Sequence, residues 1–178
     1  MTYEAILVAV LAIVITIVVF LVRRLLSSGK RYVLLTGLND TGKTLIYSQL
    51  VYNRHVATFT SSQDNEGQFN TQKNFVTLVD LPVFHSIRQQ FFEKYKASSK
   101  GIVYVVDSVT LAQNVRDAAN VLYNILIDPA VVKNRPQLLI LCNKQNQTLA
   151  KGCTVIKSML EKELNTLGYL ATLKSYCG

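Results

Sequence analysis

The chain has 178 residues and a formal net charge of +8 at pH 7, a length that suits one domain with an appendage. Basic residues gather just after an apolar N-terminal run, at Arg23, Arg24, Lys30 and Arg31. This position favours contact with an anionic membrane surface over binding in a nucleic-acid groove, so we expect no direct contact with nucleic acid.

Three cysteines, Cys142, Cys153 and Cys177, are spread over the C-terminal part of the chain. Their number is odd and their spacing shows no pairs, which is typical of free thiols in a reducing compartment. The sequence therefore predicts neither a disulfide framework nor a zinc site.

Residues 5–22 carry no charge and are long enough for a membrane-spanning helix, which needs about 17–25 apolar residues. A secretory signal peptide is the alternative, but here the positive charge follows the apolar run and no small-residue cleavage site comes after it. Thr2 in place of glycine excludes an N-myristoyl anchor. Because positive residues flank the cytosolic side, we expect residues 1–4 to be luminal and everything after the span to be cytosolic.

After a basic linker at residues 23–31, short apolar segments alternate with amphipathic ones over residues 32–178. The expected strands are "YVLLT", "FVTLVDL", "GIVYVVD" and "QLLILC", and a polar stretch at about 58–74 predicts a loop with one edge strand. Helical spacing predicts three apolar faces, made of Ile87, Phe91, Phe92 and Tyr95, of Val115, Ala119, Leu122 and Leu126, and of Ile156, Met159, Leu160 and Leu164. This alternation predicts an α/β fold with a mostly parallel sheet and helices on both faces.

The stretch "GLNDTGKT" at residues 37–44 matches the phosphate-binding pattern G-x-x-x-x-G-K-[ST] and lies between an expected strand and an expected helix. Glycine is needed there because backbone N–H groups must approach phosphate oxygens without obstruction. The helix that follows directs its N-terminus at the anion. The candidate phosphate-binding residues are Gly37, Asn39, Asp40, Thr41, Gly42, Lys43 and Thr44.

Two further segments follow expected strands in the way the motifs of P-loop GTPases do. Asp80 ends "FVTLVD", the position at which such proteins have an aspartate that holds Mg²⁺ through water. The hydroxyl of Thr44 in this chain is the candidate direct ligand of the metal. Val83 stands where these GTPases have glycine; its backbone N–H remains a candidate donor to a phosphate, although a β-branched residue restricts peptide rotation. "NKQN" resembles the guanine motif N-K-x-D through Asn143, Lys144 and Asn146.

Together these motifs resemble the beta subunits of the signal recognition particle receptor, an Arf/Sar-like family of small GTPases. "LLTGLNDTGKT", "DLP" followed by "SIR", "NKQN" and "KSMLEKELNTL" carry the resemblance, which covers essentially the whole chain. It implies a P-loop NTPase fold behind one transmembrane helix, GTP and Mg²⁺ as ligands, and an endoplasmic reticulum membrane location. It also implies that the chain docks the alpha subunit for cotranslational targeting, near the ribosome or translocon.

The chain departs from the family pattern at Val83 and Phe84, at Asn146, and at its end. Asn146 in place of aspartate removes a charged acceptor for guanine, at a cost of about 1–3 kcal/mol. The sequence stops at Gly178 without the final strand and base loop of related GTPases, which favours a truncated isoform or an incomplete gene model with an exposed sheet edge.

Phe84 cannot orient an attacking water, and His85, the neighbouring titratable residue, is expected in an extended segment pointing away. We therefore expect nucleotide binding with negligible intrinsic hydrolysis, and His85 is only a weak catalytic candidate. Two alternatives remain: a membrane scaffold that no longer switches, and an Arf/Sar-type trafficking GTPase. The second is disfavoured because those proteins use an amphipathic or myristoylated N-terminus.

Overall fold

The computed structural model of the chain describes residues 13, 15–18, 32–53, 65–70 and 75–168, and it divides into two compact units, Met1–Lys30 and Arg31–Gly178. In the first unit the described residues are helical, and the side chains of Ile13, Ile15, Ile17 and Val18 are about half exposed. None of the helices among the described residues has both the length and the hydropathy to cross a bilayer. Most of residues 5–22 lies outside the described part, so the predicted span stays a prediction.

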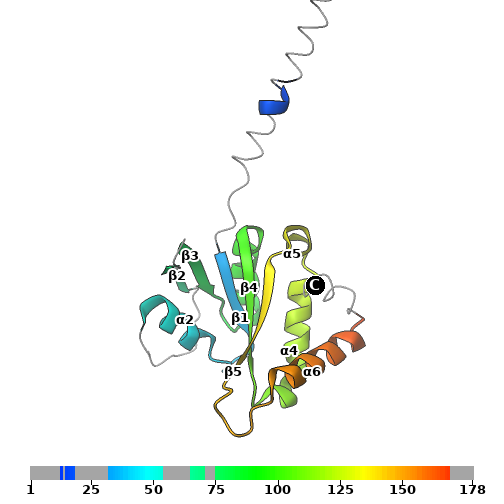
Figure 1. Cartoon of the computed structure of the whole chain (residues 1–178). Coiled ribbons are helices and arrows are strands. Elements are labelled where there is room, and N and C mark those ends of the chain that lie inside the picture. Colours follow the sequence, from blue (N-terminus) through cyan, green and yellow to red (C-terminus); the bar gives the residue numbers. More distant parts are fainter. Residues whose placement is uncertain (1–12, 14, 19–31, 54–64, 71–74, 169–178) are drawn as a thin grey trace, which may run out of the picture. The chain divides into compact units, whose positions relative to one another are not determined.

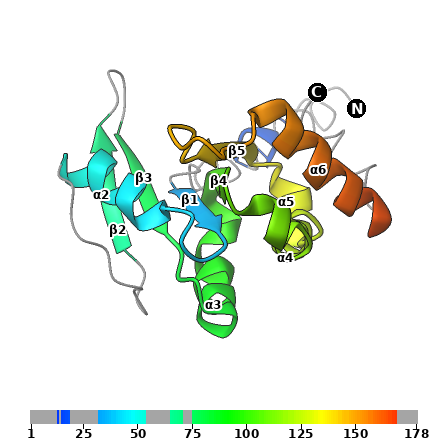
Figure 2. The same cartoon turned by 90° about the horizontal axis from the view of Figure 1, so that it is seen from below.

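The second unit is built on a sheet that has five strands among the described residues, in the order β2-β3-β1-β4-β5 (Figures 1 and 2). The strands are β1 (Tyr32–Gly37), β2 (Asn65–Asn70), β3 (Phe75–Asp80), β4 (Ser99–Asp107) and β5 (Gln137–Asn143). Strand β1 pairs in parallel with β3 and β4, and β4 pairs in parallel with β5, whereas the edge strand β2 runs antiparallel to β3. The predicted mostly parallel sheet and the edge strand within the polar stretch are both confirmed.

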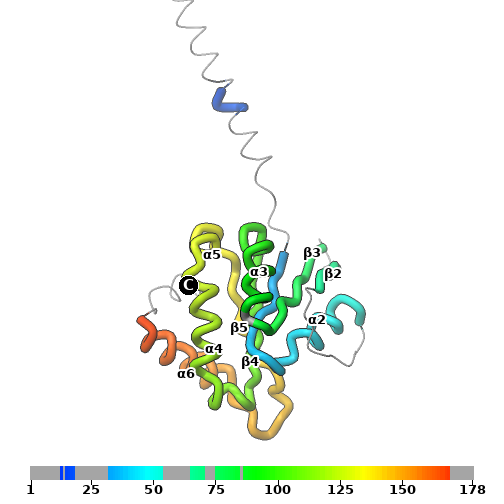
Figure 3. The backbone as a smooth tube through the Cα atoms, turned by 180° about the vertical axis from the view of Figure 1, so that it is seen from behind, coloured from blue at the N-terminus to red at the C-terminus, as the bar shows by residue number. Residues whose placement is uncertain are grey.

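Helices lie on both faces of this sheet, as predicted. They are α2 (Lys43–Tyr52), α3 (His85–Tyr95), the short 3-10 helix η1 (Lys96–Ser98), α4 (Leu111–Leu126), α5 (Pro129–Asn134) and α6 (Cys153–Thr166). Figure 3, seen from behind, shows α3 and α4 in front of the strands, and α6 packs beside α4 in the larger core. Helix α2 covers the opposite face, where Leu35, Tyr47 and Leu78 form a smaller cluster.

Coverage of the two faces is unequal among the described residues. Leu139 on β5 pairs with Val103 on β4, and Val103 packs against the cluster under α2. Side chains of paired residues share a face, so Leu139 lies on the α2 face, and it is 54% exposed. Among the described residues, helix α2 therefore covers the part of this face formed by β1, β3 and β2 and leaves Leu139 on β5 uncovered.

The predicted helical faces are largely buried. Phe92, Tyr95, Ala119, Leu122, Leu126, Ile156, Leu160 and Leu164 belong to the larger core, whereas Ile87, Phe91, Val115 and Met159 are only half-buried. Helix α5 was not predicted from the sequence. Pro129 is its first residue, and the side chain of Asp128 caps the helix by accepting from the Ala130 and Val131 N–H groups.

Parallel pairing brings the carboxyl ends of four strands to one edge of the sheet. Gly37, Asp80, Asp107 and Asn143 end β1, β3, β4 and β5 respectively. Ligands of open α/β sheets bind outside the carboxyl ends of the strands, so this edge is where a functional site is expected.

Candidate functional site

Two glycines shape the loop between β1 and α2. Gly37 has φ +145°, and a Cβ atom there would lie 2.2 Å from the Val105 carbonyl oxygen. Gly42 has φ +86°, and a Cβ atom there would lie 2.4 Å from Nδ2 of Asn143. Both positions combine a left-handed backbone with close approach of another strand end, so no other residue fits without displacing its neighbour.

The Lys43 side chain is 4% exposed and folds back over the loop. Its Nζ donates to the Leu38 carbonyl oxygen and, at 3.3 Å, to the Thr41 hydroxyl. Burial lowers the pKa of Lys43 to about 8, although the nearby Asp80 carboxylate opposes this shift. A desolvated ammonium at the first residue of α2 gains from an incoming anion, which suits a phosphate ligand.

The other predicted loop residues surround Lys43. Thr41 is buried and its hydroxyl donates to the Leu38 carbonyl oxygen at 3.0 Å, while Asn39 and Asp40 are exposed at the tip of the loop. Asp40 has φ +56°, a left-handed conformation that aspartate tolerates better than most residues. The loop therefore turns sharply and leads directly into the N-terminus of α2.

Thr44 and Asp80, the predicted magnesium residues, lie in contact. The Thr44 hydroxyl donates to Oδ2 of Asp80 at 2.7 Å. Asp80 is 4% exposed; burial raises its pKa, against the hydrogen bond from Thr44 and the charge of Lys43. Among the described residues its Oδ1 atom has no hydrogen-bond partner of good geometry, although the Asn65 side chain is close enough to influence its pKa.

This donor set fits Mg²⁺ bound together with a phosphate. Mg²⁺ prefers hard oxygen ligands and keeps several waters, so one hydroxyl and one carboxylate are enough when phosphate oxygens complete the shell. Among the described residues no group of three or more His, Cys, Asp or Glu side chains forms a dedicated metal cage. The residues therefore fit a metal that arrives with a ligand.

The "NKQN" segment is tied both to the loop and to β4. Nδ2 of Asn143 donates to the Thr41 carbonyl oxygen at 2.8 Å, through the space that the missing Cβ of Gly42 leaves open. Nζ of Lys144 pairs with Oδ2 of Asp107 at 2.9 Å. Burial would raise the pKa of Asp107, but hydrogen bonds from Lys144 and from the Val109 N–H outweigh it and hold that pKa below its usual range.

The rest of this segment is anchored through Gln145, whose Nε2 donates to the Ser108 hydroxyl at 2.7 Å and to the Lys151 carbonyl oxygen at 2.8 Å. Asn146 is exposed at the turn that follows. The segment thus presents Asn146 from a backbone that is fixed on both sides.

The residues after Asp80 lead directly into helix α3. Val83 is half-buried, Phe84 is 56% exposed, and α3 begins at His85. The prediction that His85 lies in an extended segment is therefore wrong. Helix α3 starts at His85, so successive side chains there do not point to opposite sides as they do in a strand. The position of the His85 side chain lies outside the described part of the structure.

Sequence reasoning missed two charged residues of this region. Asp107 was treated only as the end of a strand, although it ends a buried strand beside the site as Asp80 does, and that shared pattern was a usable signal. Arg88 on α3 lies close enough to Lys43 for its charge to lower the pKa of Lys43. No local sequence pattern points to that proximity, which depends on how α3 packs.

Comparisons with known proteins agree with this geometry. The family model described as "Signal recognition particle receptor beta subunit" matches residues 28–172. The human signal recognition particle receptor subunit beta is 44% identical over 169 residues, covering 93% of this chain and 62% of the human protein. The corresponding protein of Saccharomyces cerevisiae is 28% identical over 136 residues, covering 74% of this chain and 55% of its own length. The chain thus spans less than two thirds of the length of these curated relatives.

Solved structures show the same similarity. One described as the mammalian SRP receptor has a TM-score of 0.73 and 44% identity, covering 77% of this chain and 74% of its own. A receptor complex described as SRb-GTP/SRX, from Chaetomium thermophilum, has a TM-score of 0.67 at 20% identity and covers 79% of this chain and 80% of its own. The Trypanosoma brucei small GTPase Arl6, described with bound GppNp, has a TM-score of 0.61 at 21% identity. The match covers 77% of this chain and 79% of the Arl6 chain. The last two establish a shared small-GTPase fold.

Proposed function

The chain belongs to the family of signal recognition particle receptor beta subunits, and from this premise we propose that it is a GTP-binding subunit which docks the alpha subunit at the endoplasmic reticulum membrane. Residues 5–22 would anchor it as a single-pass protein, with residues 32–178 in the cytosol. Its task there is cotranslational targeting, close to the ribosome or the translocon.

The observation that carries the proposal is the hydrogen bond from Asn143 to the Thr41 carbonyl oxygen, at 2.8 Å between residues 102 positions apart. It joins the "NKQN" segment to the loop around Lys43. A ligand that bears phosphates at one end and a planar base at the other suits two such neighbouring elements. This favours a nucleoside triphosphate over a simple phosphate.

Each residue then has a role in holding GTP. The backbone of residues 37–44 receives the phosphates, Lys43 neutralises the β- and γ-phosphates, and the Val83 N–H donates to the γ-phosphate. Thr44 would hold Mg²⁺, with Asp80 acting through water, and the metal would supply charge neutralisation at the phosphates. Asn143, Lys144 and Asn146 recognise guanine.

The alternative of a scaffold that no longer switches keeps some support from Phe84 and Asn146. The Phe84 side chain is 56% exposed and offers no hydrogen bond to water, and the carboxamide of Asn146 has one acceptor oxygen where the aspartate of the guanine motif has two. The two functions differ in one respect: a receptor subunit holds the alpha subunit only in its GTP-bound form, and a scaffold holds it in every state.

A titration of the full chain in nanodiscs with Mg²⁺ and GTP, XTP or ATP tests the proposal. We expect GTP to bind at least about ten-fold more tightly than ATP, and Asn146→Asp to strengthen GTP binding roughly 5- to 150-fold while weakening XTP. Lys43→Ala should abolish binding. Equal affinity for GTP and ATP, or binding that survives Lys43→Ala, would show that these segments do not hold a guanine nucleotide.

A second measurement separates the receptor from the scaffold. Capture of the alpha subunit by the nanodisc-bound chain should require GTP and should disappear with GDP or in Lys43→Ala. Capture of equal strength in all three conditions would establish the scaffold instead.

A further inference from the structure

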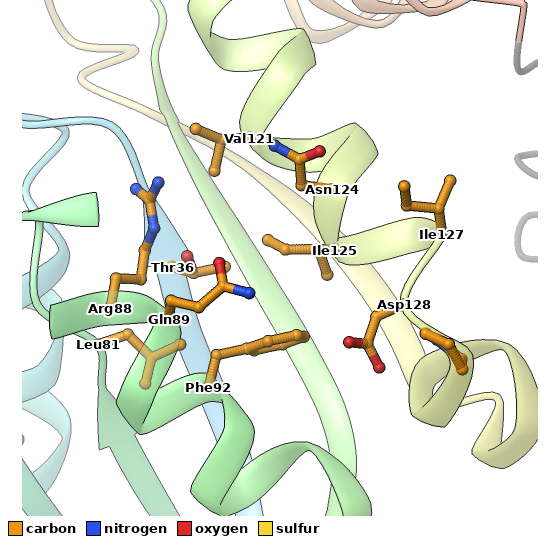
Figure 4. Close-up of a pocket in the computed structure, with 11 residues that line it drawn as sticks. Thr36, Leu81, Arg88, Gln89, Phe92, Val121, Asn124, Ile125, Ile127 and Asp128 are labelled. Carbon is orange, nitrogen blue, oxygen red and sulfur yellow. The ribbon is translucent and has the colours of Figure 1, made fainter. Parts of the chain in front are cut away.

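A cavity of about 400 Å³ lies between α3, α4 and the start of α5, with the end of β1 at its base (Figure 4). This volume is within the range of about 300–1,000 Å³ that small-molecule sites occupy. Thr36, Arg88, Phe92, Asn124 and Ile125 are among the residues that line it. None of the residues assigned above to phosphate or guanine binding lines this cavity.

One end of the cavity is cationic. The Arg88 side chain is half-buried and makes no ion pair with a carboxylate among the described residues. Burial lowers the pKa of Arg88, against the opposing influence of Tyr104. A partly desolvated guanidinium with five donors, and with no ion-paired carboxylate in the part of the chain that the structure describes, favours an anionic ligand.

Thr36 at the base of the cavity adds no accessible polar group. The residue is 1% exposed, and its hydroxyl oxygen, which has no hydrogen-bond partner among the described residues, is closed off from space that a water molecule could occupy. The Arg88 guanidinium is therefore the group that gives this end of the cavity its charge.

The opposite end of the cavity, at Asp128, offers no free charge to a ligand. Asp128 lies across the cavity from Arg88, with Phe92 and Ile125 between them (Figure 4). Its carboxylate is already engaged, by Lys96 at 2.8 Å and by the Ala130 N–H at 2.8 Å. Between the two ends the wall is largely apolar, which suits the body of a ligand rather than a second charge.

We propose that this cavity binds a small organic carboxylate, with the carboxylate at Arg88 and an aromatic or branched apolar body against Phe92 and Ile125. The Arg88 guanidinium donates charge-assisted hydrogen bonds to the carboxylate. The assignment does not depend on nucleotide binding, so it is tested without nucleotide.

Isothermal titration of the full chain in nanodiscs with 3-phenylpropanoate tests the proposal, with 3-phenylpropanol and 3-phenylpropylamine as probes of the same body. We expect the carboxylate to bind at least about ten-fold more tightly than the alcohol, and the amine to bind no better than the alcohol. Empty nanodiscs give the heat of partition into lipid, which is subtracted. Equal affinities for the carboxylate and the alcohol, or no saturable binding of the carboxylate at millimolar concentration, overturn the proposal.

Three variants locate the site. Arg88→Gln should weaken the carboxylate about ten-fold and leave the alcohol unchanged, whereas Arg116→Gln makes the same charge change on a side chain that is 88% exposed and should have no effect. Arg88→Lys keeps the charge but replaces the planar fork of donors with a single ammonium, and it should weaken the carboxylate several-fold. If Arg88→Gln does not fold, Arg88→Lys decides alone: unchanged carboxylate affinity in that variant overturns the assignment.

Discussion

Gly42 is the residue on which the loop and the "NKQN" segment both depend. Its left-handed backbone starts α2, and its missing side chain leaves the space through which Asn143 reaches the Thr41 carbonyl oxygen. The glycine of the phosphate pattern therefore has a structural task here, in addition to the phosphate binding proposed above. A substitution at this position tests both tasks at once.

We predict that Gly42→Ala destabilises the chain by about 1–3 kcal/mol, because alanine is strained at positive φ and its Cβ displaces the Asn143 amide. The free energy of unfolding is measured by titrating the full chain with denaturant and following its fluorescence. Gly152→Ala is the matched control, since Gly152 has φ −64° and nothing lies within 4 Å of an added Cβ. Equal midpoints for the two variants would contradict the predicted clash.

The pKa of Lys43 predicts a pH dependence. Its value of about 8 in the folded chain is below that of an unfolded lysine, about 10.4, so the unfolded state binds more protons between these values. The free energy of unfolding therefore increases as pH rises from about 8 to about 10.4, by at most about 3 kcal/mol. The difference between wild type and Lys43→Met isolates this contribution, because other groups titrate in both. A difference that does not change over this pH range would contradict the prediction.

At the scale of elements, the strands and long helices follow from local patterns, and α5 does not. Apolar runs and 3.6-residue spacing predict β1, β3, β4, β5, α4 and α6, since each element's own face specifies it. Helix α5 has six residues, too few for a periodic pattern, and it depends on the Asp128 cap and on Lys96 from η1. Contacts of this kind link segments that sequence spacing does not relate.

We predict that Asp128→Ala destabilises the chain by about 2 kcal/mol, because it removes both the cap of α5 and the partner of Lys96, whose side chain is 16% exposed. Asp128→Asn keeps a capping oxygen and should cost about half as much. Glu161→Ala is the control: it removes an exposed pair with Lys157 at 3.8 Å and should change stability by less than about 0.5 kcal/mol. Thermal unfolding of the three variants checks the order, and equal effects of Ala and Asn would assign the whole cost to the ion pair.

At the scale of the whole molecule, the motifs of the candidate site were predictable and their connections were not. The residues 37–44, Asp80 and Asn143 each end or follow an apolar strand, so parallel pairing alone brings them to one edge. The bonds from Asn143 to Thr41 and from Lys144 to Asp107 join residues far apart in the chain. The cavity beside Arg88 depends on how α3 and α4 lie next to each other on the sheet, which no single segment encodes.

If the chain binds GTP as proposed, its side chains predict slow hydrolysis of that nucleotide. Phe84 occupies the position at which switch GTPases orient water, and it is 56% exposed with no group that can hydrogen-bond. We expect single-turnover hydrolysis by the full chain in nanodiscs to be slower than about 3 × 10⁻⁴ s⁻¹, the intrinsic rate of Ras. The measurement is made with and without the alpha subunit, so that a contribution from the partner is visible.

Two variants at neighbouring positions give this measurement its control. Phe84→His places a hydrogen-bonding side chain where water is oriented and should raise the rate at least about ten-fold, since a positioned acid–base group contributes about 10²–10⁴-fold in favourable cases. His85→Ala should leave the rate unchanged. Turnover at the rate of Ras in the wild-type chain, lost in His85→Ala, would instead mean that the first residue of α3 reaches the attacking water and that this chain hydrolyses GTP by itself.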